Sequence, residues 1–137
     1  MGYRSEVVLA IAPEAASAFM AMLAKNPEAM SLCQSADTFR SGYESRGDWI
    51  VYWSSIKWYE GCEDIDAIRD FIDLLASDDM SEYGLTEAPP GQRRDGTMYP
   101  RSWEEYFSFL RIGEDYSDIH QEGCGFDSIG ISRSIYF

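Results

Sequence analysis

The sequence predicts an α+β fold, in which a mainly antiparallel sheet carries two helices packed on one face. Three observations lead to this prediction: alternating apolar stretches, two stretches with apolar residues at helical spacing, and their order along the chain. The predicted order is β–α–β–β–α–β followed by further strands, so we expect a ferredoxin-like start with extra C-terminal strands. The 137 residues form a single domain, 1–137, because this length leaves little room for a second.

The first elements follow from local composition. Residues 3–11 are rich in β-branched side chains and predict a strand whose odd-numbered side chains share one face. Pro13 opens a helix, because proline is tolerated in the first turn and the alanine-rich stretch after it favours helix. Pro27 should end or kink this helix, and residues 28–33 add one or two further turns.

A hairpin and a second helix follow. Residues 38–43 and 49–56 predict two strands joined as a hairpin, because residues 44–48 between them have turn composition. Residues 63–76 form the clearest helix of the chain, with an apolar stripe at helical spacing. The stripe consists of Ile65, Ile68, Phe71, Ile72 and Leu75.

The second half of the chain contains shorter elements. Residues 83–87 are a candidate short strand, and residues 88–102, with three Pro and three Arg, predict a loop that is either mobile or functional. Residues 106–113 predict a strand, and another strand follows over about 116–121. Residues 129–137 alternate between apolar and polar types and predict one C-terminal strand.

The charge of the chain is acidic and unevenly distributed. The 24 acidic and 11 basic residues give a formal net charge of -13. Residues 60–87 hold ten acids and only Arg69, a net charge of -9, while residues 104–127 hold seven acids and only Arg111. Direct nucleic-acid binding and binding to an anionic membrane are disfavoured, because both need surplus Lys and Arg. We expect a cytoplasmic protein, because the three Cys are widely spaced and no apolar run is long enough to span a bilayer.

No pattern in the sequence assigns a catalytic residue, a cofactor or a metal ion. His120 is the only histidine, and together with Cys33, Cys62 and Cys124 it lacks the short ligand spacings of zinc sites. Glycine-rich nucleotide-binding motifs do not occur. A hydrolase would rest only on abundant carboxylates and His120, so we expect no enzyme.

The helix over residues 63–76 carries the strongest functional signal. Four of its carboxylates share one face, although like-charged neighbours cost about 0.2–0.5 kcal/mol per pair. Selection for stability alone would favour lysine at some positions of this face, because opposite charges would then be neighbours. A row of anions about 5 Å apart matches phosphate spacing along DNA and would compete for grooves that hold nucleic acid. A merely solvated face is the alternative interpretation. The row consists of Glu63, Asp66, Asp70 and Asp73.

An aromatic pair comes directly before this helix. Trp58 and Tyr59 are consecutive and cannot both face inward on a strand, so we expect at least one to be exposed as an interface anchor beside Glu60. Packing against the end of the helix is the alternative. Further acidic candidates for partner binding follow the helix and the strand over 106–113: Asp78, Asp79, Glu114, Asp115 and Asp118.

Three segments resemble a group of small uncharacterised proteins encoded by tailed phages and prophages. They are residues 2–7 (GYRSEV), 56–61 (IKWYEG) and 109–115 (FLRIGED), about a seventh of the chain. The resemblance implies expression in a bacterial host cytoplasm during infection. It brings no catalytic motif, but small acidic phage proteins include anti-CRISPR and anti-restriction DNA mimics.

Together these features predict a non-enzymatic inhibitor. We expect it to act by protein–protein interaction on a basic nucleic-acid-handling protein or complex of a bacterial host. The alternative is a small-ligand or metal-binding regulatory domain, in which the Arg-rich loop 93–101 holds an anion and the carboxylate bend 114–118 holds a cation.

Overall fold

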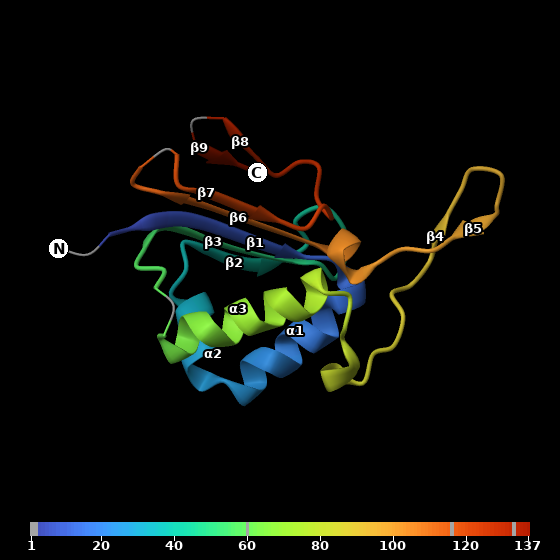
Figure 1. The fold of residues 1–137 in the computed structure, drawn as a ribbon, viewed down its shortest axis with the longest axis horizontal. Coiled ribbons are helices and arrows are strands. Elements are labelled where there is room, and N and C mark those ends of the chain that lie inside the picture. The colour runs from blue at the N-terminus through green and yellow to red at the C-terminus, as the bar shows by residue number, and fades with distance from the viewer. Residues whose placement is uncertain (1–2, 60, 116, 133) are drawn as a thin grey trace.

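A strand buried on both faces, β1 (Ser5–Ile11), lies at the centre of the main sheet. The computed structural model describes residues 3–59, 61–115, 117–132 and 134–137. β1 pairs with one neighbour through its full length on each side, and every pairing in this sheet is antiparallel. The strand order is β2 (Thr38–Ser41), β3 (Trp49–Ile56), β1, β6 (Phe107–Gly113) and β7 (Ile119–Glu122) (Figure 1).

The order of four of these strands confirms the predicted ferredoxin-like start. β1 and β2 are connected through helices and separated in the sheet by β3. In the same way β3 and β6 are connected through a helix and separated by β1. The strand predicted over about 116–121 is β7, which extends the sheet beyond β6, and Tyr116 lies outside the described residues. The predicted α+β class is thereby confirmed.

Three helices cover one face of the sheet (Figure 1): α1 (Pro13–Lys25), α2 (Pro27–Gln34) and α3 (Glu63–Ala76). We expected two helices, and the difference arises at Pro27, which lacks the N–H needed to continue the hydrogen-bond ladder of α1. Asn26 alone separates α1 from α2. None of the helices in the described part of the chain has the length and apolar content that a bilayer span requires.

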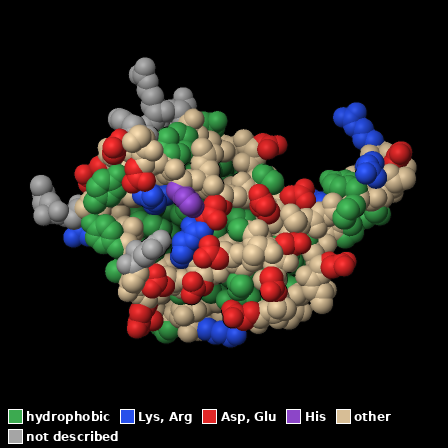
Figure 2. Space-filling view, viewed as in Figure 1, with side chains coloured by type: hydrophobic (Ala, Val, Ile, Leu, Met, Phe, Trp, Pro, Cys, Tyr) green, Lys and Arg blue, Asp and Glu red, His purple; other side chains and the backbone are tan. Residues whose placement is uncertain are grey.

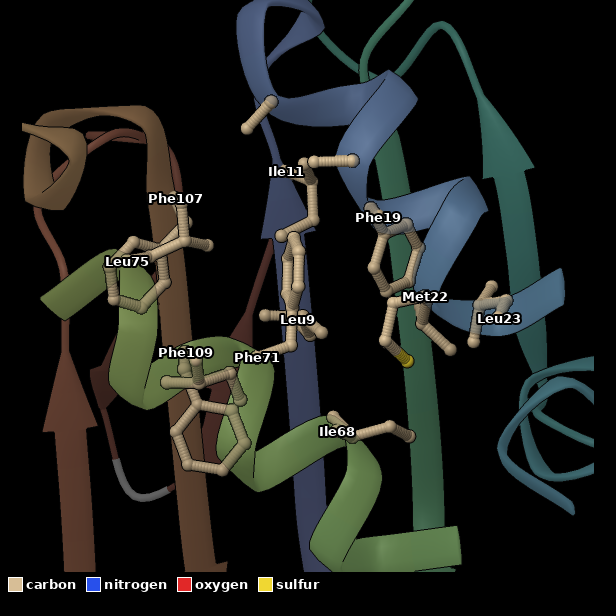
Figure 3. Packing of buried hydrophobic residues seen from close by; sticks show 14 of the residues in the cluster. Leu9, Ile11, Phe19, Met22, Leu23, Ile68, Phe71, Leu75, Phe107 and Phe109 are labelled. Atoms are coloured by element: carbon tan, nitrogen blue, oxygen red, sulfur yellow. The ribbon is translucent and has the colours of Figure 1, made fainter. Parts of the chain in front are cut away.

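The main hydrophobic core lies between the helices and the sheet. Leu9 and Phe109 from the strands meet Phe19 and Phe71 from the helices (Figure 3). The ring centroids of Phe19 and Phe71 are 5.7 Å apart. All five apolar residues of the stripe predicted for α3 are buried, so this helix is held by its inner side. Complete burial of each large apolar side chain stabilises the fold by about 1.5–3 kcal/mol.

The opposite face of the sheet is covered by a C-terminal hairpin, β8 (Gly130–Ser132) and β9 (Ser134–Tyr136) (Figure 1). The prediction of one strand over 129–137 is therefore wrong. Alternation of apolar and polar residues occurs in two short strands of a hairpin as well as in one long strand. The hairpin forms here because the apolar second face of the sheet has to be covered. Phe126 and Ile135 help to provide that cover and belong to a second buried cluster.

The segment between α3 and β6 also differs from the prediction. The strand expected over 83–87 is wrong, because Ser81–Tyr83 form a 3₁₀ turn and the following residues pair with no strand. The loop 88–102 contains a small hairpin, β4 (Gly91–Gln92) and β5 (Met98–Tyr99). This hairpin projects from the body of the molecule as an arm (Figure 1).

A buried carboxylate holds the predicted turn between β2 and β3. Asp48 is fully buried and accepts the backbone N–H groups of Tyr43, Glu44 and Ser45 at 2.8, 2.9 and 3.2 Å. Three N–H donors compensate the loss of hydration of this charge. The turn is thus closed by its last residue.

Helix α3 ends in a left-handed turn at Asp78, the one non-glycine residue in the described ranges with a positive φ, +59°. The N–H groups of Asp78 and Asp79 donate to the carbonyls of Leu75 and Leu74, which is a Schellman motif. The carboxylate of Asp78 also accepts the N–H of Trp103 at 2.8 Å. Asp78 therefore ends the helix and ties it to the segment that enters β6.

Replacing Asp78 by alanine should lower the free energy of unfolding by about 1–3 kcal/mol. Alanine carries the full steric cost of the left-handed conformation and leaves the N–H of Trp103 without its acceptor. Asp78→Asn should stay close to the original stability, because asparagine tolerates this conformation and its amide oxygen still accepts. Urea denaturation measures both variants. Equal stability of the two would show that neither effect matters at this position.

Candidate functional site

The predicted acidic row lies along the outer side of α3, opposite the buried stripe. We call Glu63, Asp66, Asp70 and Asp73 the acidic ridge. It covers about 15 Å, at 1.5 Å of rise per residue. Figure 2 shows acidic side chains over this part of the surface, with basic and uncharged groups among them.

Two of the four carboxylates of the acidic ridge bind other groups within the protein. Asp66 accepts a backbone N–H from the preceding loop at 2.9 Å. Asp73 accepts the guanidinium of Arg69 at 2.7 Å. Glu63 and Asp70 are exposed, and in the described part of the chain their carboxylates have no hydrogen-bond or ion-pair partner. The ridge thus presents two free carboxylates and two that are partly compensated.

The two carboxylates predicted after α3 serve its C-terminal turn. Asp78 accepts the N–H of Trp103, and Asp79 accepts the backbone N–H and the hydroxyl of Ser81 at 3.2 and 2.7 Å. The hydrogen bonds from Ser81, the hydroxyl first, lower the pKa of Asp79. Both aspartates are exposed, but their hydrogen bonds give them a structural role.

The acidic bend between β6 and β7 is also bonded to the fold. Glu114 accepts the N–H of Arg4 at 2.8 Å, and Asp115 accepts the N–H and hydroxyl of Ser117 at 3.0 and 2.9 Å. Over the described ranges, no three His, Cys, Asp or Glu side chains are grouped closely enough to hold a metal ion. The bend and the Arg-bearing arm also lie at opposite ends of the molecule (Figure 1), so they do not form one site.

The aromatic pair before α3 has two different environments. Trp58 is half-buried and packs on Phe109, with ring centroids 5.6 Å apart. Tyr59 is 39% exposed and donates its hydroxyl to the carbonyl of Tyr3 at 2.9 Å. The prediction that at least one ring is exposed is confirmed by Tyr59. A role of either ring in partner binding stays a prediction, and Glu60 lies outside the described residues.

Beside α3 lies a hollow of about 690 Å³, which the sequence did not predict and which we call the arginine hollow. Arg69 from α3, Arg111 from β6 and His120 from β7 border it. Basic side chains and the single histidine gather there beside apolar ones (Figure 2). The remaining lining residues are Tyr3, Trp58, Tyr59, Asp73, Phe109 and Asp118.

Strand register explains why these side chains meet. Phe109 and Arg111 are two residues apart on β6 and share one face of the sheet. Phe109 is paired with Glu122 on β7, and Arg111 is paired with His120. Because Phe109 belongs to the core under the helices, the other three also lie on that side of the sheet.

Arg69 joins α3 to this part of the sheet. Its guanidinium binds Asp73 on its own helix and Glu122 on β7, and lies 5.4 Å from the ring centre of Phe109. The same oxygen of Glu122 lies 2.8 Å from Nε2 of His120. Burial disfavours the ionised form of Glu122, but the hydrogen bonds from Arg69 and His120 outweigh burial, so the pKa of Glu122 is lowered.

A second ion pair, between Arg111 and Asp118, also lines the hollow. Arg111 donates to both oxygens of Asp118 at 3.1 and 2.9 Å, and the hydroxyl of Tyr3 donates to Asp118 at 2.9 Å. Arg111 is the main cause of the lowered pKa of Asp118, and Tyr3 adds to it. Of the predicted partner-binding residues, the structure therefore brings four to one hollow: Trp58, Tyr59, Asp73 and Asp118.

The lowered pKa values of Asp118 and Glu122 predict a loss of stability in acid. Their interactions stabilise the fold above the unfolded pKa values, near about 4, and this contribution is lost as the pH falls through the lower folded values. Asp118→Asn should therefore show a shallower decline of unfolding free energy below about pH 4 than the original protein. Urea denaturation over a pH series measures it, with Asp127→Asn as the exposed control. Equal pH dependence of the original protein and Asp118→Asn would contradict the prediction.

No protein-family model, no curated protein and no solved structure matches this chain. The similarity to phage proteins in three short segments therefore stays a hypothesis. Function has to be inferred from the acidic ridge and the arginine hollow.

Proposed function

We propose that the chain is a non-enzymatic, phage-encoded inhibitor that binds a host protein through its acidic ridge. The partner would be a basic, nucleic-acid-handling protein of the host cytoplasm, and the ridge would act as a DNA mimic of the anti-CRISPR or anti-restriction type. The observation that carries this proposal is the position of four carboxylates on the outer side of a helix whose inner side is core. Phosphate-binding grooves are rich in Lys and Arg, and such a row offers them negative charge at regular spacing.

Electrostatic attraction would speed the association of this protein with its partner. The net charge of -9 over residues 60–87 creates an asymmetric field that steers a basic partner towards α3. Salt screens this attraction over about 10 Å at 0.1 M ionic strength. The buried stripe holds α3 independently of the ridge, so ridge charges can be reversed while the helix remains packed.

An aromatic anchor beside the ridge would slow dissociation of the complex. Exposed charges at the rim of an interface contribute little once they are screened, whereas a desolvated aromatic ring carries a large share of the binding free energy. Tyr59 is exposed and borders the same hollow as Asp73 of the ridge. The two features are therefore close enough to contact one partner.

Reversing the two free ridge carboxylates should abolish capture of the partner. The Glu63→Lys/Asp70→Lys variant and a Glu87→Lys/Asp127→Lys control carry the same change in net charge, and all four side chains are exposed. Each protein is immobilised and exposed to nuclease-treated bacterial lysate, and the retained proteins are identified by mass spectrometry. The original protein and the control should retain the same nucleic-acid-binding protein. High salt or added duplex DNA should release it, because DNA and the ridge compete for one groove.

Equal retention by the ridge variant and the control would contradict the proposal, because the ridge would then not contact the partner. Release by salt but not by DNA would exclude DNA mimicry and leave only an electrostatic contact.

Replacing Tyr59 by alanine should speed dissociation of the captured partner. Loss of a hot-spot ring costs about 2 kcal/mol, which is about 30-fold in affinity, and the change should lie in the dissociation rate. Tyr59→Phe keeps the ring and should bind almost normally, while the ridge variant should slow association first. Surface plasmon resonance separates the two rates. Unchanged dissociation of Tyr59→Ala would exclude Tyr59 as the anchor.

A further inference from the structure

The two arginines that line the arginine hollow have N–H donors without an acceptor among the described residues. Arg69 donates through Nε and Nη2 to two carboxylates, and its Nη1 has no acceptor in the described part of the chain. Arg111 donates through Nη1 and Nη2, and its Nε has no acceptor among the described residues. His120 contacts Glu122 only through Nε2. Charged donors without acceptors favour a ligand that supplies acceptor oxygens.

The carboxylates around the hollow limit the charge of such a ligand. Asp73 and Asp118 border the hollow and Glu122 lies beside it, and each already binds a guanidinium or the imidazole. A cationic ligand would compete with these internal partners for the acidic oxygens. A dianion would meet three negative charges within a chain of net charge -13. A single negative charge fits the two guanidiniums with the least repulsion.

The apolar part of the lining is aromatic. Tyr3 and Tyr59 expose 37% and 39% of their surface, and the half-buried Trp58 packs on the buried Phe109. His120 meets the Phe109 ring edge-on, with centroids 5.9 Å apart. Rings arranged in this way accept a flat ring by stacking or by edge contact. The volume of about 690 Å³ lies within the range of about 300–1,000 Å³ usual for small-molecule sites.

We propose that the arginine hollow binds a small aromatic monoanion, a flat ring that carries one carboxylate or sulfonate group. Arg69 and Arg111 hold the anionic group through their unused N–H donors, and the ring lies against Trp58 and Tyr59. The free ridge carboxylates Glu63 and Asp70 do not line this hollow. The site shares Tyr59 and Asp73 with the proposed partner surface, but it goes beyond the proposed inhibitor function and its test needs no protein partner.

The single histidine makes the hollow directly observable by NMR. The ring C–H signals of His120 come from one residue only, so their shifts report on this site. Three probes are titrated at constant pH: 2-naphthoate, its uncharged analogue 2-naphthamide, and acetate. 2-Naphthoate should shift the His120 signals to saturation and bind at least about tenfold more tightly than either of the others, because only it combines the ring and the charge.

A paired substitution tests the role of the guanidinium. Arg111→Gln/Asp118→Asn removes a cation and its partner carboxylate together, so neither charge is left unpaired. This variant should bind 2-naphthoate about tenfold more weakly. Arg93→Gln on the arm, outside the hollow, is the matched control and should bind as the original protein does. Thermal melting confirms that both variants are folded.

Four outcomes would overturn the proposal. If 2-naphthamide binds as tightly as 2-naphthoate, the hollow is only an apolar patch. Equal binding of acetate would show that the rings take no part. Unmoved His120 signals, or an unchanged affinity of a folded Arg111→Gln/Asp118→Asn variant, would place any binding elsewhere. The probe series uses the original protein, so it decides the proposal even if the paired variant does not fold.

Discussion

Burial of β1 on both of its faces is the constraint on which the rest of the structure depends. Val7, Val8, Leu9, Ala10 and Ile11 are all inaccessible to solvent. A central strand of this kind is stable only if each face of its sheet has an apolar cover. The three helices cover one face and the C-terminal hairpin covers the other (Figure 1). The apolar side of α3 packs on the sheet as part of the helical cover, so the charged side of this helix must face solvent.

The acidic residues of this chain have several different physical roles. Asp48, Asp78, Asp79 and Asp115 accept backbone N–H groups and hold turns or the end of a helix. Glu63 and Asp70 have no such bond in the described ranges and contribute charge alone. The surplus of acid along the sequence therefore overstates the free negative charge at the surface. The acidic net charge of these segments also gives no indication that two arginines border the hollow.

Local patterns predicted most of the fold but little of the site. Apolar spacing predicted α3 with its buried stripe, and turn composition predicted the β2–β3 hairpin. The C-terminal hairpin was missed because alternation is the same in one strand and in two short ones. The arginine hollow was missed because Arg69, Arg111 and His120 come from three elements and have no common spacing. The one available signal was that Arg69 and Arg111 are the sole bases within their acidic segments.

The pairing of β1 has a consequence for how the chain reaches this fold. Ser5 lies opposite Ile56 on one side and opposite Gly113 on the other, so neither neighbour of the central strand is local in sequence. Such long-range pairing slows folding, because a long loop must close before the strand gains its contacts. Until β6 has been synthesised, β1 is an apolar strand with an unpaired edge. We therefore expect β1 to be prone to aggregation while the chain is being made.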